Sequence, residues 1–470
     1  MLAKVLAVLL LTALPARAQD QASPQAPFNI LIIDICSARA DHFGSYGYKK
    51  KTTPGMDAFA KEGVLFENAM AQASWCLANY ASLFTGHTPE VHGVYAMAPR
   101  TLPESQRTVT QRLKEAGYDT AAYSGGTWLM PDWGLDRGFD TYVNTVSTGP
   151  WVTAFSKKMP DMLDWIKARQ GRPFFLYASI EDLHLPYAPE MSLVQEPDSE
   201  SVDLERDGGK APLLRSPDGS APKPQDPPLP EPGIKTSSAK ARPELAAKYD
   251  GSLSRADRQI GEFMARLKEL GLWEKTVVIV TGDHGESLGE HGLTGHMEGL
   301  YEPVLHVPLI VRHPGFPALR GRRFPQLVER IDLAPTLLDI AGQPYGDMEL
   351  QGRSLLSLFQ EPSVPWREYA FAASKRSTSF ASDFVLDERV ARTRRWKLHW
   401  YMYKNRFELY DLLNDPREER DLSRKRPDIV SNLSFELIRH LETARPHAPG
   451  LPSGKTPVEP AGIRLKPKTD

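Results

Sequence analysis

The sequence contains only two cysteines, Cys36 and Cys76, among its 470 residues. So few cysteines exclude a disulfide-rich scaffold, in which several bridges compensate for a small hydrophobic core. An excess of positive charge is also missing, because 57 Lys and Arg residues are balanced by 59 Asp and Glu residues. Without a basic field or basic runs, the sequence gives no reason to expect a nucleic-acid partner.

Long hydrophobic runs are absent beyond the first 18 residues. Residues 1–18, MLAKVLAVLLLTALPARA, combine a lysine, an apolar stretch and a small-x-small ending at Ala16 and Ala18. This pattern is typical of a cleaved signal peptide. No later apolar run reaches the ~18 to 20 residues of a membrane-spanning helix. We therefore expect an exported protein, secreted or periplasmic after cleavage, whose two cysteines are able to pair in an oxidising compartment.

The residues that are present favour alternating strands and helices. Hydrophobic residues make up 41% of the chain, enough for one large domain and a smaller one. Apolar runs predict strands at 28–33, 64–69, 120–123, 173–180, 276–280 and 307–311. Helical patterns lie between them at 54–63, 78–84, 109–116, 245–271 and 331–341. This alternation predicts an α/β fold with a large, mainly parallel sheet flanked by helices.

Composition divides the chain further. The main domain is predicted to span 27–345, and a proline-rich insertion at 193–241 is expected to be flexible. Shorter strands and a late helix at 427–441 predict a smaller C-terminal α+β subdomain at 346–444. Residues 445–470 hold many prolines and few aliphatic residues, so we predict a disordered tail.

Polar residues follow several of the predicted strands. Asp34 and Cys36 end the first, His184 follows the strand at 173–180, and Asp283 and His284 follow the strand at 276–280. Open α/β sheets bind ligands at this edge. Asp283 could also cap a turn and His284 could be a core histidine, but their joint position at a strand end favours a site.

Cys76 stands just ahead of the predicted helix at 78–84. Unpaired backbone N–H groups and the helix dipole favour an anion there and lower the pKa of a thiol. A nucleophile facing an anionic ester fits this position. Cys76 could equally be a buried small hydrophobic residue, because free cysteine is among the most buried residue types.

Seven motifs then occur in a recognisable order: RADHFGSYGY (39–48), TTPGMDAFAKEGVLFENA (52–69), SLFTG (82–86), GLDRGFDTY (134–142), VIVTGDHGESLGEHG (278–292), IDLAPTLLDIAG (331–342) and ELYDLLNDPREERDLS (408–423). Together they resemble the type I sulfatases of the alkaline-phosphatase-like superfamily. The resemblance covers most of 28–422 apart from the proline-rich insertion, and makes 27–345 the expected catalytic domain.

The resemblance implies hydrolysis of a small-molecule or carbohydrate sulfate ester at a divalent cation, with calcium as the expected ion. In this family a cysteine is oxidised to formylglycine, whose hydrate attacks sulfur. By position, Cys76 matches the formylglycine site, and Asp283 and His284 match two metal ligands. His184 and His296 match groups that contact the sulfate or protonate its leaving oxygen. The metal would offset charge on the sulfuryl oxygens and activate the attacking hydroxyl.

The modification motif departs from the family pattern. C-x-P-x-R is replaced by CLANY at 76–80, with Ala78 for proline and Tyr80 for arginine. The lysine and histidine that many sulfatases place after the strand matching 120–123 are also absent, because 124–139 contains neither. These departures leave the conversion of Cys76 to formylglycine open.

The expected metal site departs as well. Cys36 and Ser37 occupy the positions of the family's first metal-binding aspartates. Asp34 lies two residues earlier, roughly 6 to 7 Å back along the strand, and could serve as a metal ligand only if the strand end bulged. Calcium prefers six to eight oxygen ligands, so a cysteine weakens such a site.

Three alternatives to a calcium-dependent sulfatase follow. Cys36 and Cys76 could form a disulfide across the pocket, leaving an inactive relative that binds a sulfated or phosphorylated ligand or a partner. If both stay reduced, Cys36, Cys76, Asp283 and His284 could bind a softer ion such as zinc. Hydrolysis of a phosphodiester or phosphonate is the third, because fold does not fix function.

Overall fold

The computed structural model describes residues 27–95, 101–145, 155–169, 171–184, 187, 241–296, 298–377 and 385–444. The predicted signal peptide (1–18), nearly all of the predicted insertion (193–241) and the predicted tail (445–470) lie outside these residues. Among the helices within them, none is long and apolar enough to cross a bilayer.

An eight-stranded sheet forms the centre of the main domain, in the order β10-β2-β9-β6-β1-β5-β3-β4. All neighbours pair in parallel except β9, which runs antiparallel to both β6 and β2. The strands are β1 (Asn29–Ile35), β2 (Val64–Met70), β3 (Asp119–Ser124), β4 (Thr141–Asn144), β5 (Phe174–Ile180), β6 (Thr276–Gly282), β9 (Leu309–Arg312) and β10 (Arg323–Glu329). The predicted α/β class with a mainly parallel sheet is confirmed.

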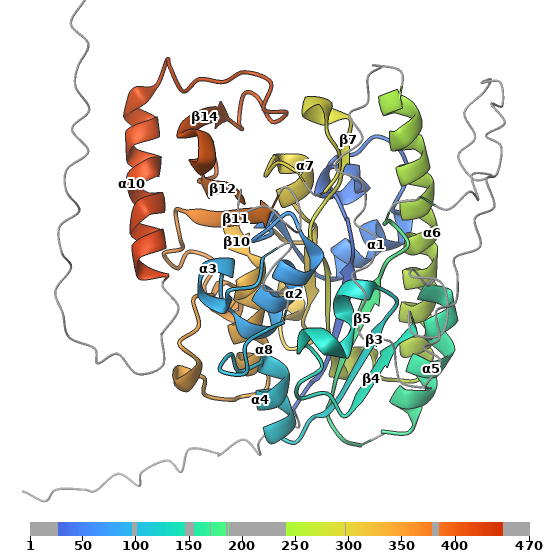
Figure 1. The fold of residues 1–470 in the computed structure, drawn as a ribbon. Coiled ribbons are helices and arrows are strands. Elements are labelled where there is room, and N and C mark those ends of the chain that lie inside the picture. Colours follow the sequence, from blue (N-terminus) through green and yellow to red (C-terminus); the bar gives the residue numbers. More distant parts are fainter. Residues whose placement is uncertain are drawn as a thin grey trace, which may run out of the picture.

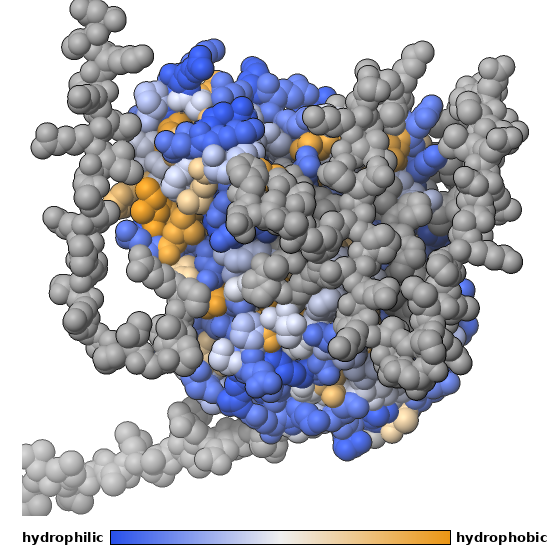
Figure 2. All heavy atoms as spheres, in the orientation of Figure 1, coloured by the Kyte–Doolittle hydropathy of each residue, from blue (hydrophilic) through white to orange (hydrophobic). Residues whose placement is uncertain are grey.

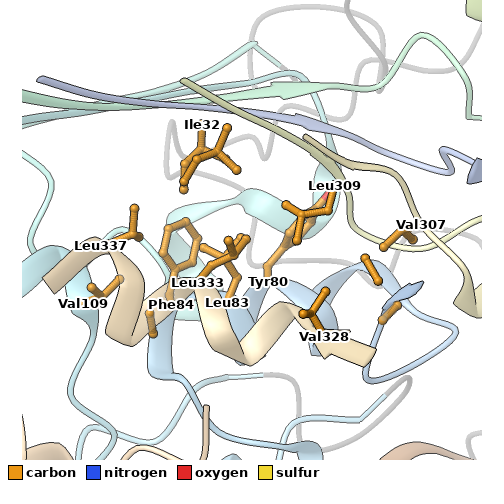
Figure 3. Close-up of a cluster of buried hydrophobic side chains, with 14 of the residues drawn as sticks. Ile32, Tyr80, Leu83, Phe84, Val109, Val307, Leu309, Val328, Leu333 and Leu337 are labelled. Atoms are coloured by element: carbon orange, nitrogen blue, oxygen red, sulfur yellow. The ribbon is translucent and has the colours of Figure 1, made fainter. Parts of the chain in front are cut away.

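Helices cover both faces of this sheet (Figure 1). Alternate residues of β1 explain this, because Ile30 and Ile32 pack into one buried cluster while Leu31 and Ile33 pack into another. The first cluster includes residues of α2 (Cys76–Thr85), α4 (Val109–Glu115) and α8 (Leu333–Ile340). Figure 3 shows Ile32 above side chains from these three helices. The second includes residues of α1 (Pro54–Glu62), α5 (Phe155–Lys167) and α6 (Ala241–Glu269).

Short elements complete the main domain. They are α3 (Pro89–His92), β7 (Ser287–Leu288), β8 (Thr294–Gly295), α7 (Glu302–Leu305) and α9 (Leu356–Gln360). Strands β7 and β8 pair with each other just after β6.

A four-stranded antiparallel sheet follows, in the order β11-β12-β13-β14. Its strands are β11 (Ala370–Ser377), β12 (Val385–Arg392), β13 (Trp396–Tyr401) and β14 (Arg406–Asp411). The last helix, α10 (Pro427–Thr443), packs Leu433 and Leu437 against buried residues of this sheet. Its opposite side exposes Phe435 and Ile438, and hydrophobic residues reach the surface over α10 in Figure 2. This sheet and helix form the C-terminal α+β unit.

A buried ion cluster joins this unit to α7. The side chain of Lys397 in β13 is fully buried, with Nζ 2.9 Å from Glu418 and 3.2 Å from Glu302 at the start of α7. Arg392 in β12 lies 3.0 Å from Glu302. Burial would raise the pKa of Glu302, but Arg392 and Lys397 outweigh it and hold that pKa far below its usual range. Oppositely charged side chains, buried together, thus link the C-terminal unit to α7 of the main domain.

We predict that Lys397→Met lowers the free energy of unfolding by ~3 to 5 kcal/mol, because it leaves buried carboxylates without their cation. Urea unfolding measures this change. Arg266→Met is the control, since the Arg266–Glu269 pair is exposed on α6, and its unfolding midpoint should stay at the wild-type value. Equal midpoints for the two variants would contradict the importance of the cluster.

Candidate active site

The candidate site lies where β1, β5 and β6 end. Strands β1 and β6 are parallel neighbours whose registers pair Ile35 with Gly282, so the residues that follow them, Cys36 and Asp283, emerge side by side. Strand β5 lies on the other side of β1 and leads to His184. Helix α2 brings Cys76 to the same point. Residues from four distant segments of the sequence therefore meet.

Cys76 is the first residue of α2 and is buried. Its Sγ lies 3.0 Å from Nε2 of His284, 3.9 Å from Sγ of Cys36 and 4.0 Å from Nε2 of His296. The preceding residue, Trp75, makes no side-chain cap. The thiol thus sits at a helix N-terminus with no side-chain cap, facing two imidazoles and a second thiol.

Asp283 and His284 are fixed by backbone groups. Oδ1 of Asp283 accepts hydrogen bonds from the backbone N–H groups of Ser37 (2.9 Å) and His284 (2.7 Å). Its Oδ2 is buried and has no hydrogen-bond partner. Nδ1 of His284 lies 2.8 Å from the carbonyl oxygen of Gly285, which only accepts, so Nδ1 carries a proton and Nε2 faces Cys76.

His296 and His184 complete the group. Nδ1 of His296 lies 3.3 Å from a carboxylate oxygen of Glu286, and its ring centre is 5.1 Å from that of His184. Candidate ligand atoms of Cys76, His184 and His296 all lie within 4.8 Å of one another. The structure therefore brings all three predicted catalytic residues together.

The pKa values of the two thiols are shifted in opposite directions. Burial would raise the pKa of Cys76, but a hydrogen bond from Cys36 and the positive charge of His284 outweigh it and hold that pKa well below its usual range. The hydrogen bond to Cys76 and burial raise the pKa of Cys36 well above its usual range. Burial raises the pKa of Asp283 to about 6. Cys76 is thus the more acidic of the two thiols.

Asp34 does not join this group. Its two carboxylate oxygens accept hydrogen bonds from Arg330, at 3.0 and 2.7 Å, and the Tyr177 hydroxyl donates to it at 2.8 Å. The register of β1 is uninterrupted through Ile35, so the strand end does not bulge as a metal-binding role would require. The structure thus places Asp34 in a buried ion pair, which corrects its predicted place among the metal donors.

A cavity of about 30 Å³ opens beside the cysteines, lined by Cys36, Cys76, Tyr80, Gly126, Thr127, Trp128, Glu181 and His184. Tyr80 is buried one helical turn after Cys76, at the position of the family motif's arginine. A neutral phenol, and not the guanidinium that the resemblance leads us to expect, therefore stands in the wall of this cavity.

Sequence reasoning missed a cation near this cavity. Lys158 of α5 is buried, with Nζ 2.7 Å from Glu181 and 2.6 Å from the carbonyl oxygen of Ser179. Its only signal would have been a lysine among helical apolar residues, and nothing in the sequence pairs it with Glu181. Arg330 was missed for the same reason, because its partner Asp34 is 296 residues away.

The donor atoms do not fit calcium. Cys36, Cys76, Asp283 and His284 place four candidate ligand atoms within 4.8 Å of one another, and all four residues are buried. Calcium takes six to eight oxygen ligands, whereas this set offers two sulfurs, a nitrogen and a single carboxylate.

Comparisons with known proteins agree with this architecture. A sulfatase family model matches residues 29–343, and a model of the N-sulphoglucosamine sulphohydrolase C-terminal region matches 289–445. An arylsulfatase of Clostridium perfringens is 27% identical over 88% of this chain and 94% of its own length. Human N-sulphoglucosamine sulphohydrolase is 26% identical over 84% of this chain and 88% of its own length.

Solved structures share the fold at low identity. A protein in complex with its substrate D-glucosamine-2-N,6-O-disulfate superposes with a TM-score of 0.70 at 18% identity, covering 89% of this chain and 98% of the other. The phosphonate monoester hydrolase of Agrobacterium radiobacter gives 0.70 at 20% identity, covering 89% and 96%. The match of the sulfatase family model to residues 29–343, more than half of the chain, shows that the chain belongs to the sulfatase family.

Proposed function

We propose that this protein is an exported sulfatase-type hydrolase that cleaves the sulfate ester of a small molecule or carbohydrate at a divalent-metal site. The observation that carries the proposal is the position of Cys76. It begins α2, lies 3.0 Å from His284, and shares a cluster with His184 and His296. This arrangement supplies a nucleophile, an anion-binding helix end and proton donors in one place.

Cys76 supplies the attacking group, either as its thiolate or as the hydrate of the formylglycine derived from it. The lowered pKa of Cys76 favours its thiolate form. The N-terminus of α2 favours the negative charge of the sulfuryl group that Cys76 would attack. A bound divalent ion would offset charge on the sulfuryl oxygens.

His296 is the best-placed group to protonate the leaving oxygen. Burial would lower its pKa, but Glu286 and the hydrogen bond to Cys76 raise it well above the usual range, so the ring holds a proton. Glu286 binds Nδ1 and thereby aims Nε2 toward Cys76. His184, which follows β5, lines the cavity beside the two cysteines.

The relatives support a sulfated substrate. Two of them are named arylsulfatase and N-sulphoglucosamine sulphohydrolase, and a solved structure of this fold holds a sulfated glucosamine. Trp128 lines the cavity and could stack on a sugar. Trp133 is buried and packs against Trp128, so its role is in packing.

We predict that the purified protein hydrolyses an aryl sulfate and that Asp283→Asn lowers kcat/KM by about 100-fold or more, because metal binding and the orientation of His284 depend on this carboxylate. Release of the phenol, followed by absorbance, measures the rate. Asp257→Asn is the matched control. Asp257 is also buried, but it accepts hydrogen bonds from Gly55 and Met56 at the start of α1.

Equal activity of the Asp283→Asn variant and the wild type would contradict the assignment. Turnover of a phosphodiester or phosphonate without turnover of any sulfate ester would mean that the substrate is a phosphorus ester and not a sulfate ester. That result would be in line with the structural similarity to a phosphonate monoester hydrolase.

One observation favours a second candidate, an inactive relative that binds a sulfated or phosphorylated ligand or a partner. The Sγ atoms of Cys36 and Cys76 are 3.9 Å apart, and a disulfide of about 2.05 Å would require them to approach by roughly 2 Å. Such a bond would remove the nucleophile.

We predict that diamide, a mild thiol oxidant, joins Cys36 to Cys76 within one chain of the metal-free protein and abolishes turnover. Non-reducing peptide mapping by mass spectrometry identifies the linked peptides, and the same experiment detects formylglycine at position 76. Cys36→Ser should keep a free thiol under the same treatment. If diamide yields only intermolecular dimers, the predicted proximity of the two thiols is contradicted.

A further inference from the structure

We propose that Cys36, Cys76, Asp283 and His284 form a four-coordinate site for a thiophilic divalent ion of the zinc class, in place of calcium. The inference deepens the proposed function by naming the ion for the form of the protein in which Cys76 is an unmodified thiol and would attack as a metal-bound thiolate. The binding of that ion can be measured without turnover. The resemblance implies calcium, but these four residues offer mainly sulfur and nitrogen donors, which calcium does not favour.

The separations between donor atoms fit one small ion. Two sulfurs bound to a tetrahedral zinc at about 2.3 Å would be roughly 3.8 Å apart, and Sγ of Cys36 and Sγ of Cys76 are 3.9 Å apart. A nitrogen and an oxygen at about 2.0 to 2.1 Å would be roughly 3.4 Å apart. Nε2 of His284 and Oδ2 of Asp283 are 3.5 Å apart. The 3.0 Å between Nε2 of His284 and Sγ of Cys76 is shorter than a shared ion requires, and all four donor atoms lie within 4.8 Å of one another.

The fourth donor atom, Oδ2 of Asp283, accepts no hydrogen bond and lies 3.5 Å from Nε2 of His284, which is itself one of the four donors. Oδ2 of Asp283 is buried with no hydrogen bond, although Oδ1 of the same carboxylate accepts two. A buried unpaired carboxylate oxygen is costly unless a cation or donor meets it. An ion among these four residues would satisfy it.

Neighbouring groups orient these donors. The Gly285 carbonyl accepts from Nδ1 of His284, which leaves Nε2 for the ion. The Ser37 backbone N–H holds Asp283 from the loop that carries Cys36. Contacts of this kind fix the tautomer and orientation of metal ligands.

The surroundings remove the oxygen donors that calcium would need. Both oxygens of Asp34 accept hydrogen bonds from Arg330, and Tyr177 adds another. The guanidinium of Arg330 therefore occupies the oxygens of Asp34, the carboxylate nearest to Cys36 in sequence, which are then not available to a calcium ion. The overlapping group of Cys76, His184 and His296 offers three donors and shares Cys76, so the four-donor set is the more complete one for a tetrahedral ion.

The test uses the full chain, reduced with a phosphine and stripped of metal with a chelator. Cobalt(II) should bind at one equivalent per chain and give the strong near-ultraviolet absorption of thiolate-to-cobalt charge transfer. Zinc should abolish that absorption by displacing cobalt, and an excess of calcium should leave it in place. These readouts do not depend on catalysis.

Variants locate the ion. Cys36→Ser should lose at least half of the charge-transfer absorption and bind zinc at least tenfold more weakly, and Asp283→Asn should also weaken zinc binding. Asp257→Asn, the buried control at α1, should keep the wild-type spectrum and zinc affinity. Cys36→Asp should lower the preference for zinc over calcium, because it restores an oxygen donor. Circular dichroism melts verify that each variant is folded.

Three results would overturn the inference. The reduced protein could give no charge-transfer band, it could retain calcium at one equivalent in the presence of zinc, or the folded Cys36→Ser variant could bind zinc as tightly as the wild type. Zinc binding without turnover of any ester would support the zinc site and contradict the proposed hydrolase activity. Sulfate turnover with calcium bound would support the hydrolase activity and contradict the zinc site.

Discussion

The candidate site depends on the hydrogen bond from the Ser37 backbone N–H to the Asp283 carboxylate, which joins the loops that follow β1 and β6. Ser37 adopts a left-handed backbone conformation, with φ of 63°, which costs a non-glycine residue about 1 kcal/mol or more. This turn follows Cys36 directly, and Sγ of Cys36 faces Cys76. The buried Asp283 carboxylate thus holds a strained turn directly after Cys36, next to the contact between the two thiols.

The site keeps the architecture of its family but differs in the atoms that would do the chemistry. Cys36 stands where the resemblance leads us to expect an oxygen donor, Tyr80 stands where it leads us to expect an arginine, and Arg330 binds the carboxylate of Asp34. These changes are consistent with one another, because a site with fewer oxygen donors is better suited to a softer and smaller ion. Under the proposal made above, they would let a sulfatase scaffold bind a metal beside Cys76 without the oxygen donors that calcium prefers.

Much of the fold could be predicted, because buried parallel strands such as β1 and β6 appear as continuous apolar runs. Strand β9 was recognised, but its antiparallel direction leaves no trace in an apolar run. Strand β4 was missed because it is only partly buried. Helix α5 was missed because Pro160 and two lysines interrupt its pattern. The meeting of Cys36, Asp283 and His284 could be expected from neighbouring strand ends, and that of Cys76 with them from the resemblance to the sulfatases. The pairing of Asp34 with Arg330 depends on tertiary contacts that no local pattern records.

X-ray absorption at the zinc edge of the zinc-loaded, reduced protein tests the central claim most directly, because it counts the atoms bound to the ion. We predict two sulfur neighbours at about 2.3 Å and two nitrogen or oxygen neighbours at about 2.0 to 2.1 Å. A first shell made only of nitrogen and oxygen would contradict a site built on Cys36 and Cys76.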